Sequence, residues 1–253
     1  MDLPLIYCAG KTPAAQFCMD YLKNAGLPVT TEPSSHVKFL LLDVPSFEAG
    51  GNLRLGGSVE NLLKELPGDV TICGGNLKHP AIAEYRCIDF LQSEDYLARN
   101  AYITAECALD VAYPYMQITL RNCPVLIIGW GRIGKCLGQL LRAIGADVTI
   151  AARKAKDRAM IRALGYNTAD TADLTNVLFR CRLIFNTAPE PVLDRSQMAL
   201  CRNDCVKIEL ASRDGMDDDD VIIARGLPGV HMPESSGILI AETFLHYYKE
   251  EVQ

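Results

Sequence analysis

One glycine-rich turn constrains the fold of this chain more than any other feature. The apolar run Cys123–Ile128 leads directly into residues 129–134, which read GWGRIG, and an amphipathic segment follows to about Ile144. A second apolar run, Asp147–Ala152, completes a strand–helix–strand unit of roughly thirty residues. A GxGxxG sequence in this context is typical of a dinucleotide-binding turn, because the strand delivers the glycines to a helix N-terminus that attracts phosphate.

The turn supplies the first candidate site residues. The glycines allow a tight turn, a close approach of the backbone to a pyrophosphate, and close packing of helix on strand. Free N–H groups and a partial positive charge at the start of the helix favour the anionic ligand. The candidate pyrophosphate-binding residues are Gly129, Gly131, Arg132, Ile133 and Gly134.

The residues after the second strand indicate the choice of cofactor. An NAD-specific domain usually has an acidic residue there to bind the adenosine ribose, but this chain has Ala151-Ala152-Arg153. The planar guanidinium of Arg153 matches phosphate oxygens in two parallel hydrogen bonds, and Lys154 adds a second cation. We therefore expect NADP as the cofactor, with NAD as the alternative. If neither Arg153 nor Lys154 contacts a cofactor, this segment is a solvated basic start of a helix.

Apolar runs and helical patterns alternate along the whole chain, which predicts an α/β fold: a doubly wound parallel sheet of Rossmann type with a second, smaller α/β domain. A long stretch without glycine separates the two. The expected bounds are 1–95 for the small domain, joined by a C-terminal helix over 236–253, then 96–118 for a linking helix and 119–235 for the Rossmann domain.

Composition excludes several classes of function. The 253 residues are 49% hydrophobic, and a net charge of −6 is unfavourable for nucleic-acid binding. We expect a cytoplasmic protein without a membrane segment, because no leader pattern and no long apolar run occurs. The ten cysteines have irregular spacing and no CxxC pair, so we expect reduced thiols and no metal site.

Two later strand ends add candidates, because ligands bind at the carboxyl edge of a doubly wound sheet. Asn186, Thr187 and Pro189 follow one strand and are candidate cofactor contacts. Leu210 ends the next strand and is a further cofactor candidate, while Arg213 is a candidate clamp for a substrate carboxylate or else a surface arginine.

Six segments from Asn100 onward carry a family resemblance. They are Asn100-x-x-x-Thr104-x-Glu106, the turn at 129–134, Ala152-Arg153, Asn186-Thr187-x-Pro189, Leu210-Ala211-Ser212-Arg213, and Gly226-Leu227-Pro228-Gly229 followed by Pro233 and Gly237. In this order they resemble the A subunit of bacterial dipicolinate synthase, which is related to the D-2-hydroxyacid dehydrogenases. The resemblance implies NADP-dependent oxidation of a dihydro- or tetrahydrodipicolinate intermediate to pyridine-2,6-dicarboxylate. It also implies a flavoprotein partner, the B subunit of the same enzyme, and a role in spores.

The substrate and the proton acceptor follow from the same resemblance. We expect a small dicarboxylate bound by Thr104, Arg213 and the helix start at Ser235-Ser236, with Glu106 and Glu234 as candidate proton acceptors, in a homo-oligomer.

Two alternatives remain open. The D-2-hydroxyacid dehydrogenases carry a catalytic histidine where this chain reads Pro233-Glu234-Ser235-Ser236-Gly237, and His231 is out of register. A hydroxyacid dehydrogenase would therefore need Glu234 as its base. A non-catalytic nucleotide-binding subunit is the third hypothesis.

Overall fold

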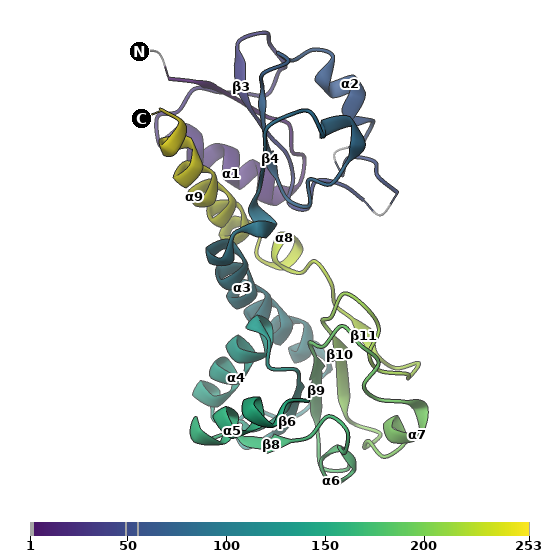
Figure 1. The fold of residues 1–253 in the computed structure, drawn as a ribbon. Helices are drawn as coiled ribbons and strands as arrows, with labels where there is room; N and C mark the ends of the chain where they lie inside the picture. Colours follow the sequence, from purple (N-terminus) through teal and green to yellow (C-terminus); the bar gives the residue numbers. More distant parts are fainter. Residues whose placement is uncertain (1–2, 49, 55, 253) are drawn as a thin grey trace. The chain divides into compact units, whose positions relative to one another are not determined.

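The computed structural model describes residues 3–48, 50–54 and 56–252, and the chain divides into two compact units (Figure 1). Unit 1 comprises Met1–Asn100 and Pro228–Gln253, and unit 2 comprises Ala101–Leu227. The long helix α3 (Glu94–Ala112) contributes residues to both. Among the described residues, no helix has the length and apolar character that a membrane span requires.

Unit 1 contains a parallel five-stranded sheet in the order β2-β1-β3-β4-β5. Its core is formed by apolar side chains from the strands and the connecting segments, with Val37, Leu40 and Ile72 fully buried. The strands are β1 (Leu5–Cys8), β2 (Val29–Thr30), β3 (Val37–Leu41), β4 (Thr71–Gly74) and β5 (Cys87–Asp89). The helices are α1 (Pro13–Asn24), α2 (Val59–Leu63), α8 (Pro228–His231) and α9 (Pro233–Val252), with 3-10 turns at Pro80–Ile82 and Phe90–Gln92.

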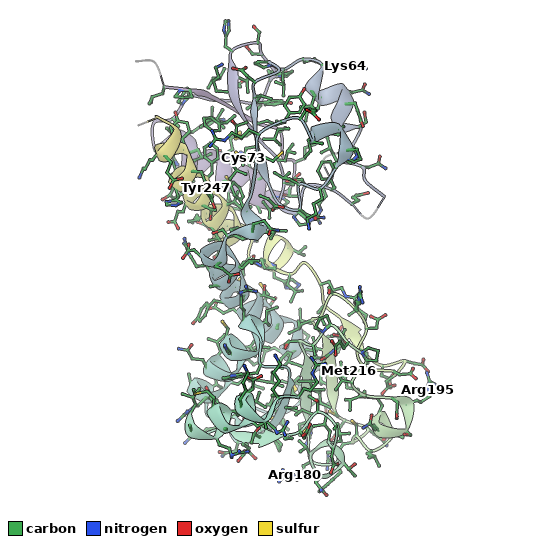
Figure 2. The ribbon with its side chains drawn as sticks, in the orientation of Figure 1. Lys64, Cys73, Arg180, Arg195, Met216 and Tyr247 are labelled. Carbon is green, nitrogen blue, oxygen red and sulfur yellow. The ribbon has the colours of Figure 1, made fainter. Side chains whose placement is uncertain are left out.

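Helix α9 packs along α1 within unit 1, and Figure 1 shows the two side by side. Gly237 permits the close approach, because a Cβ there would meet the Phe17 Cβ at 2.6 Å and the Cys18 nitrogen at 2.9 Å. Further along α9, the Tyr247 ring (labelled in Figure 2) stacks on Phe90 with centroids 6.3 Å apart. The C-terminal helix is therefore part of the core of unit 1.

Unit 2 contains a parallel six-stranded sheet in the order β11-β10-β9-β6-β7-β8. This is the dinucleotide-binding order, in which the first strand, β6, lies between the second and the fourth. The strands are β6 (Pro124–Ile128), β7 (Asp147–Ala151), β8 (Asn167–Ala169), β9 (Leu183–Asn186), β10 (Val206–Glu209) and β11 (Ile222–Ile223). The helices are α4 (Arg132–Ile144), α5 (Ala155–Ala163), α6 (Thr175–Leu178) and α7 (Arg195–Met198), with a 3-10 turn at Tyr113–Tyr115. The predicted fold class is confirmed.

Two helix boundaries differ from the sequence-based expectation. Helix α3 ends at Ala112 rather than near 118, since Pro114 disfavours helical backbone in the residue before it. Helix α9 begins at Pro233 rather than Ser236, because proline suits the first turn of a helix.

Candidate functional site

The glycine turn between β6 and α4 has the geometry that a dinucleotide requires. Gly129 has φ +106°, which side-chain-bearing residues rarely adopt. A Cβ at Gly134 would overlap the Gly129 carbonyl oxygen, so helix and strand are packed as closely as the backbone allows. Gly131 is different, because a Cβ there would meet no atom within 4 Å. The space above Gly131 is therefore open to a ligand.

The N-terminus of α4 also fits a pyrophosphate. Among the described residues, no side chain caps this helix and no acidic residue lies in its first turn. Its N-terminal N–H groups and the positive end of the helix dipole thus favour an external anion.

Thr187 supports the turn from the neighbouring strand β9. Its hydroxyl donates to the Ile128 carbonyl at 2.9 Å and lies against Gly129. A cofactor contact was predicted for Thr187, but this hydrogen bond uses the hydroxyl proton within the protein. The side chain thereby fixes the position of the glycine turn.

Asn186, the next predicted cofactor contact, has a fully buried side chain. Its amide nitrogen donates to the Glu209 carboxylate at 2.9 Å and to the Ala188 carbonyl at 3.1 Å, and its oxygen accepts from the Ala188 N–H. Glu209 is also fully buried and accepts the N–H groups of Ala211 at 3.0 Å and Gly215 at 2.9 Å. The Asn186–Glu209 pair therefore holds together the loops that follow β9 and β10.

A cavity of about 400 Å³ lies beside the glycine turn within unit 2. It brings together three predicted segments that are distant in sequence: the turn itself, the end of β7 and the loop after β9. Its lining includes Trp130 from the turn, Ala152, Arg153 and Lys154 from the end of β7, and Pro189 and Glu190 from the loop.

Arg153 reaches across this cavity. Its guanidinium forms an ion pair with Glu190 at 2.9 Å, and both side chains are exposed. Arg158, by contrast, turns back and donates to the carbonyls of Ala152 and Arg153 at 2.7 Å while pairing with Asp170 at 2.8 Å. Arg158 shapes the end of β7, and Arg153 and Lys154 are cations that line the cavity.

The loop after β10 carries Leu210 and Arg213. Leu210 is buried, and its N–H donates to the Asn186 carbonyl at 2.9 Å, so its side chain belongs to the packing beneath the site. Arg213 is exposed and, among the residues described, has no ion-pair partner. Arg225 secures this loop by donating to the Ala211 carbonyl at 2.7 Å and pairing with Asp214. An arginine available for an anion therefore projects from an anchored loop.

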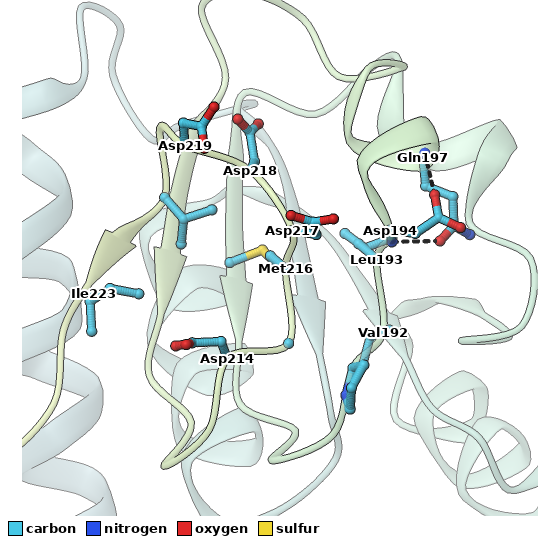
Figure 3. A pocket seen from close by; sticks show the side chains of 13 residues that line it. Val192, Leu193, Asp194, Gln197, Asp214, Met216, Asp217, Asp218, Asp219 and Ile223 are labelled. Atoms are coloured by element: carbon cyan, nitrogen blue, oxygen red, sulfur yellow. Dashed lines mark hydrogen bonds between the residues drawn. The ribbon is translucent and has the colours of Figure 1, made fainter.

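A second cavity, of about 780 Å³, lies between the segment 191–197 and the segment 214–223 (Figure 3). Five aspartates line it. Asp194 caps α7. The other four form ion pairs: Asp214 with Arg225, Asp217 and Asp219 with Arg195, and Asp218 with Lys207. The hydrogen bond from Lys207 lowers the pKa of Asp218 below its usual value. These carboxylates repel an anionic substrate, so this cavity does not suit a dicarboxylate.

The other candidates lie on helices. Thr104, which is buried, and Glu106, which is half-buried, lie on the part of α3 that belongs to unit 2. Glu234 and Ser235 are exposed in the first turn of α9, in unit 1. Ser236 is buried and its N–H donates to the Met232 carbonyl at 3.0 Å, so the start of α9 lies before this residue.

Sequence reasoning missed Glu190, Glu209 and Arg225. The only signal for Glu209 is an acidic residue at the end of the apolar strand β10. No local signal identifies Glu190, because its partner Arg153 is 37 residues away in the chain.

Comparison with known proteins supports these observations. The family described as D-isomer specific 2-hydroxyacid dehydrogenase, NAD binding domain, matches residues 91–225. The A subunit of dipicolinate synthase from Bacillus subtilis (strain 168) is 25% identical over 169 residues, which are 64% of this chain and 57% of that protein's length.

Two solved structures share the fold. The A subunit of dipicolinate synthase from Bacillus halodurans has a TM-score of 0.84 at 18% identity, covering 97% of both chains. The corresponding structure from Bacillus subtilis has a TM-score of 0.81 at 19% identity, covering 99% of this chain and 98% of that one. The resemblance to the A subunit of dipicolinate synthase that the motifs indicate is confirmed.

Proposed function

The chain belongs to the D-isomer specific 2-hydroxyacid dehydrogenase NAD-binding domain family, and from this premise we propose that it is a dipicolinate synthase A subunit. In this proposal it oxidises a dihydro- or tetrahydrodipicolinate intermediate to pyridine-2,6-dicarboxylate with NADP. The observation that carries the cofactor part is the cavity that connects the glycine turn to Arg153.

The residues that would hold the cofactor come from three loops of unit 2. The backbone of residues 129–134 takes the pyrophosphate, since the space above Gly131 is open. Arg153 and Lys154 take the 2′-phosphate of NADP, because residues 152–154, directly after β7, include no carboxylate to bind a free ribose hydroxyl instead. Pro189 forms the opposite wall.

The chemistry asks little of the protein beyond positioning. A dihydro intermediate gives up a hydride, which the nicotinamide ring accepts, and one proton, and the aromatic product drives both losses. Arg213 is our candidate for one substrate carboxylate, because it is exposed on a loop anchored by Glu209 and Arg225. A guanidinium matches a carboxylate in two parallel hydrogen bonds.

The remaining assignments rest on the motif resemblance. Glu106 and Glu234 are candidate proton acceptors, and Thr104, Ser235 and Ser236 are candidate substrate contacts. A flavoprotein partner, the B subunit of the enzyme, belongs to the same proposal, and so does a homo-oligomeric state. Light scattering after size-exclusion chromatography, with the B subunit present or omitted, tests the partner and the oligomeric state.

The decisive experiment compares two reactions. With freshly made hydroxy-tetrahydrodipicolinate, which loses water to give the dihydro compound, the protein with NADP and a B subunit should produce the ultraviolet absorbance of a pyridine dicarboxylate. Faster reduction of simple 2-keto acids would instead identify a hydroxyacid dehydrogenase. Binding of NADP with neither reaction would identify a non-catalytic subunit.

Gly131→Val supplies the control for the cofactor site. Its side chain occupies open space, so the fold should survive while the pyrophosphate is excluded. Calorimetric titration with NADP should detect no binding. Unchanged affinity would contradict the proposed site.

A further inference from the structure

Glu190 places a carboxylate beside the end of β7, where the sequence itself has no acidic residue. The acidic residue that commonly follows the second strand of such a domain is absent, since β7 ends in Ala151-Ala152-Arg153. Glu190, from the loop after β9, lines the same cavity and pairs with Arg153. We propose that Glu190 is a specificity-determining residue that competes with the 2′-phosphate of NADP for Arg153. This inference rests on the proposed dinucleotide site.

The loop holds Glu190 in a fixed position. Pro189 and Pro191 flank it, and each fixes its own backbone φ. A Cβ at Gly215 would lie 2.8 Å from the Glu190 carbonyl oxygen, so the backbone there packs directly against Gly215. The Gly215 carbonyl also accepts the N–H groups of Val192 at 2.8 Å and Leu193 at 3.0 Å.

Gly215 is itself anchored in the core, because its N–H donates to the buried Glu209 carboxylate. On the other side of the pair, Arg158 holds the Arg153 carbonyl. Both members of the pair therefore project from restrained backbone, and their side chains stay free to change partner.

Charge determines the direction of the effect. A 2′-phosphate carries more than one negative charge near neutral pH, whereas the 2′-hydroxyl of NAD carries none. Glu190 repels the phosphate and also pairs with the guanidinium that would bind it. The uncharged 2′-hydroxyl of NAD is not repelled and does not depend on that guanidinium. The wild-type preference for NADP should therefore be smaller than Arg153 alone would produce.

The test is a double-mutant cycle with wild type, Glu190→Gln, Arg153→Ala and the double variant. The dissociation constants of NADP and NAD are measured by calorimetry at one ionic strength. Glu190→Gln should tighten NADP roughly tenfold and change NAD less than about threefold. In the Arg153→Ala background, the effect of Glu190→Gln should shrink, because no guanidinium remains to be released.

Asp219→Asn is the matched control, since it removes one exposed, ion-paired carboxylate from unit 2 outside this cavity. If Glu190→Gln changed the ratio of the NADP and NAD dissociation constants no more than Asp219→Asn does, the proposed role of Glu190 would be overturned. An equal effect of Glu190→Gln in both backgrounds would overturn the competition for Arg153. Binding of neither dinucleotide to any variant would overturn the proposed function, and with it this inference.

Discussion

Units 1 and 2 each contain a glycine turn that leads from a strand into a helix, and the two turns are stabilised differently. In each, an interior parallel strand runs through a glycine-containing turn into a helix, and a polar side chain that follows the neighbouring strand lies beside that turn. In unit 1 this side chain is Asp43, which follows β3 and is buried. It accepts the N–H groups of Lys11 and Thr12 at 3.2 Å and the Thr12 hydroxyl at 2.5 Å. In unit 2 it is Thr187, which donates to the strand before the turn.

This difference decides which turn is available to a ligand. A Cβ at Gly10 in unit 1 would lie 2.9 Å from an Asp43 oxygen, whereas the space above Gly131 in unit 2 is open. In unit 1 the Asp43 carboxylate binds the N–H groups just before α1, and the Thr12 hydroxyl caps the helix by accepting the Ala15 N–H at 3.2 Å. In unit 2, no side chain among the described residues caps α4. Groups of the protein itself therefore fill the turn of unit 1, and the turn of unit 2 stays open.

Removing the Asp43 carboxylate should have the largest effect on stability. Asp43→Ala leaves the backbone donors of Lys11 and Thr12 unpaired and should lower the free energy of unfolding of unit 1 by about 3 kcal/mol. Trp130 is the only tryptophan and lies in unit 2, so its fluorescence reports unit 2 alone. In urea, the circular dichroism transition should begin earlier while the Trp130 transition stays unchanged. An equal shift of the Trp130 transition would show that the contrast between the units does not hold.

The packing of the binding turn gives the next largest effect. Gly134→Ala forces a Cβ onto the Gly129 carbonyl and should destabilise unit 2 by about 2 kcal/mol, measured by Trp130 fluorescence in urea. Gly131→Ala is the matched control, because its Cβ enters open space and should cost less than about 1 kcal/mol. It should nevertheless weaken dinucleotide binding. Equal destabilisation by both variants would mean that Gly131 is as structural as Gly134.

A smaller effect depends on pH. Lys207 and Asp218 in unit 2 pair at 2.6 Å, with 10% and 22% of their side chains exposed. Hydrogen bonding to Lys207 lowers the pKa of Asp218. Burial alone would lower the pKa of Lys207, but the hydrogen bond and charge of Asp218 outweigh it, so that this pKa is raised.

The pair therefore stabilises unit 2 above the unfolded pKa of an aspartate, about 4, and below that of a lysine, about 10.4. The contribution is lost as the pH falls through the folded pKa of Asp218 or rises through that of Lys207. Asp218→Asn should cost about 1 kcal/mol at pH 7, and this cost should decrease as the pH falls below about 4 and the wild-type carboxyl becomes protonated. A cost that persists in acid would assign the effect to packing.

Local pattern was enough to predict the elements that carry the cofactor turn. The continuous apolar run of β6, the spacing of the glycines and the helical period of α4 are each visible within one short segment. The edge strands β2 and β11 were not predicted, because each has two residues and too few positions to show a period. Strand β8, with three residues, escaped for the same reason.

The sequence predicted those parts of the candidate site that are formed by the backbone, but not the directions of the side chains around them. The glycine turn and the end of β7 could be located from sequence, and the structure brings them to one cavity. The direction of the Asn186 side chain could not, because it is set by Glu209, which is 23 residues later and on another strand. Pairings of this kind depend on the order of strands in the sheet.

The packing of α9 on α1 has a consequence for how the chain is made. Unit 1 is discontinuous, since all of unit 2 is synthesised between its first hundred residues and α9. The α1 surface that Gly237 approaches stays without its partner until the ribosome has finished unit 2. Unit 2, a continuous stretch, can complete its core during translation, which reverses the usual order in which the N-terminal domain matures first. Chaperones that shield apolar surface on nascent chains would therefore meet the first hundred residues of this protein for longer than unit 2.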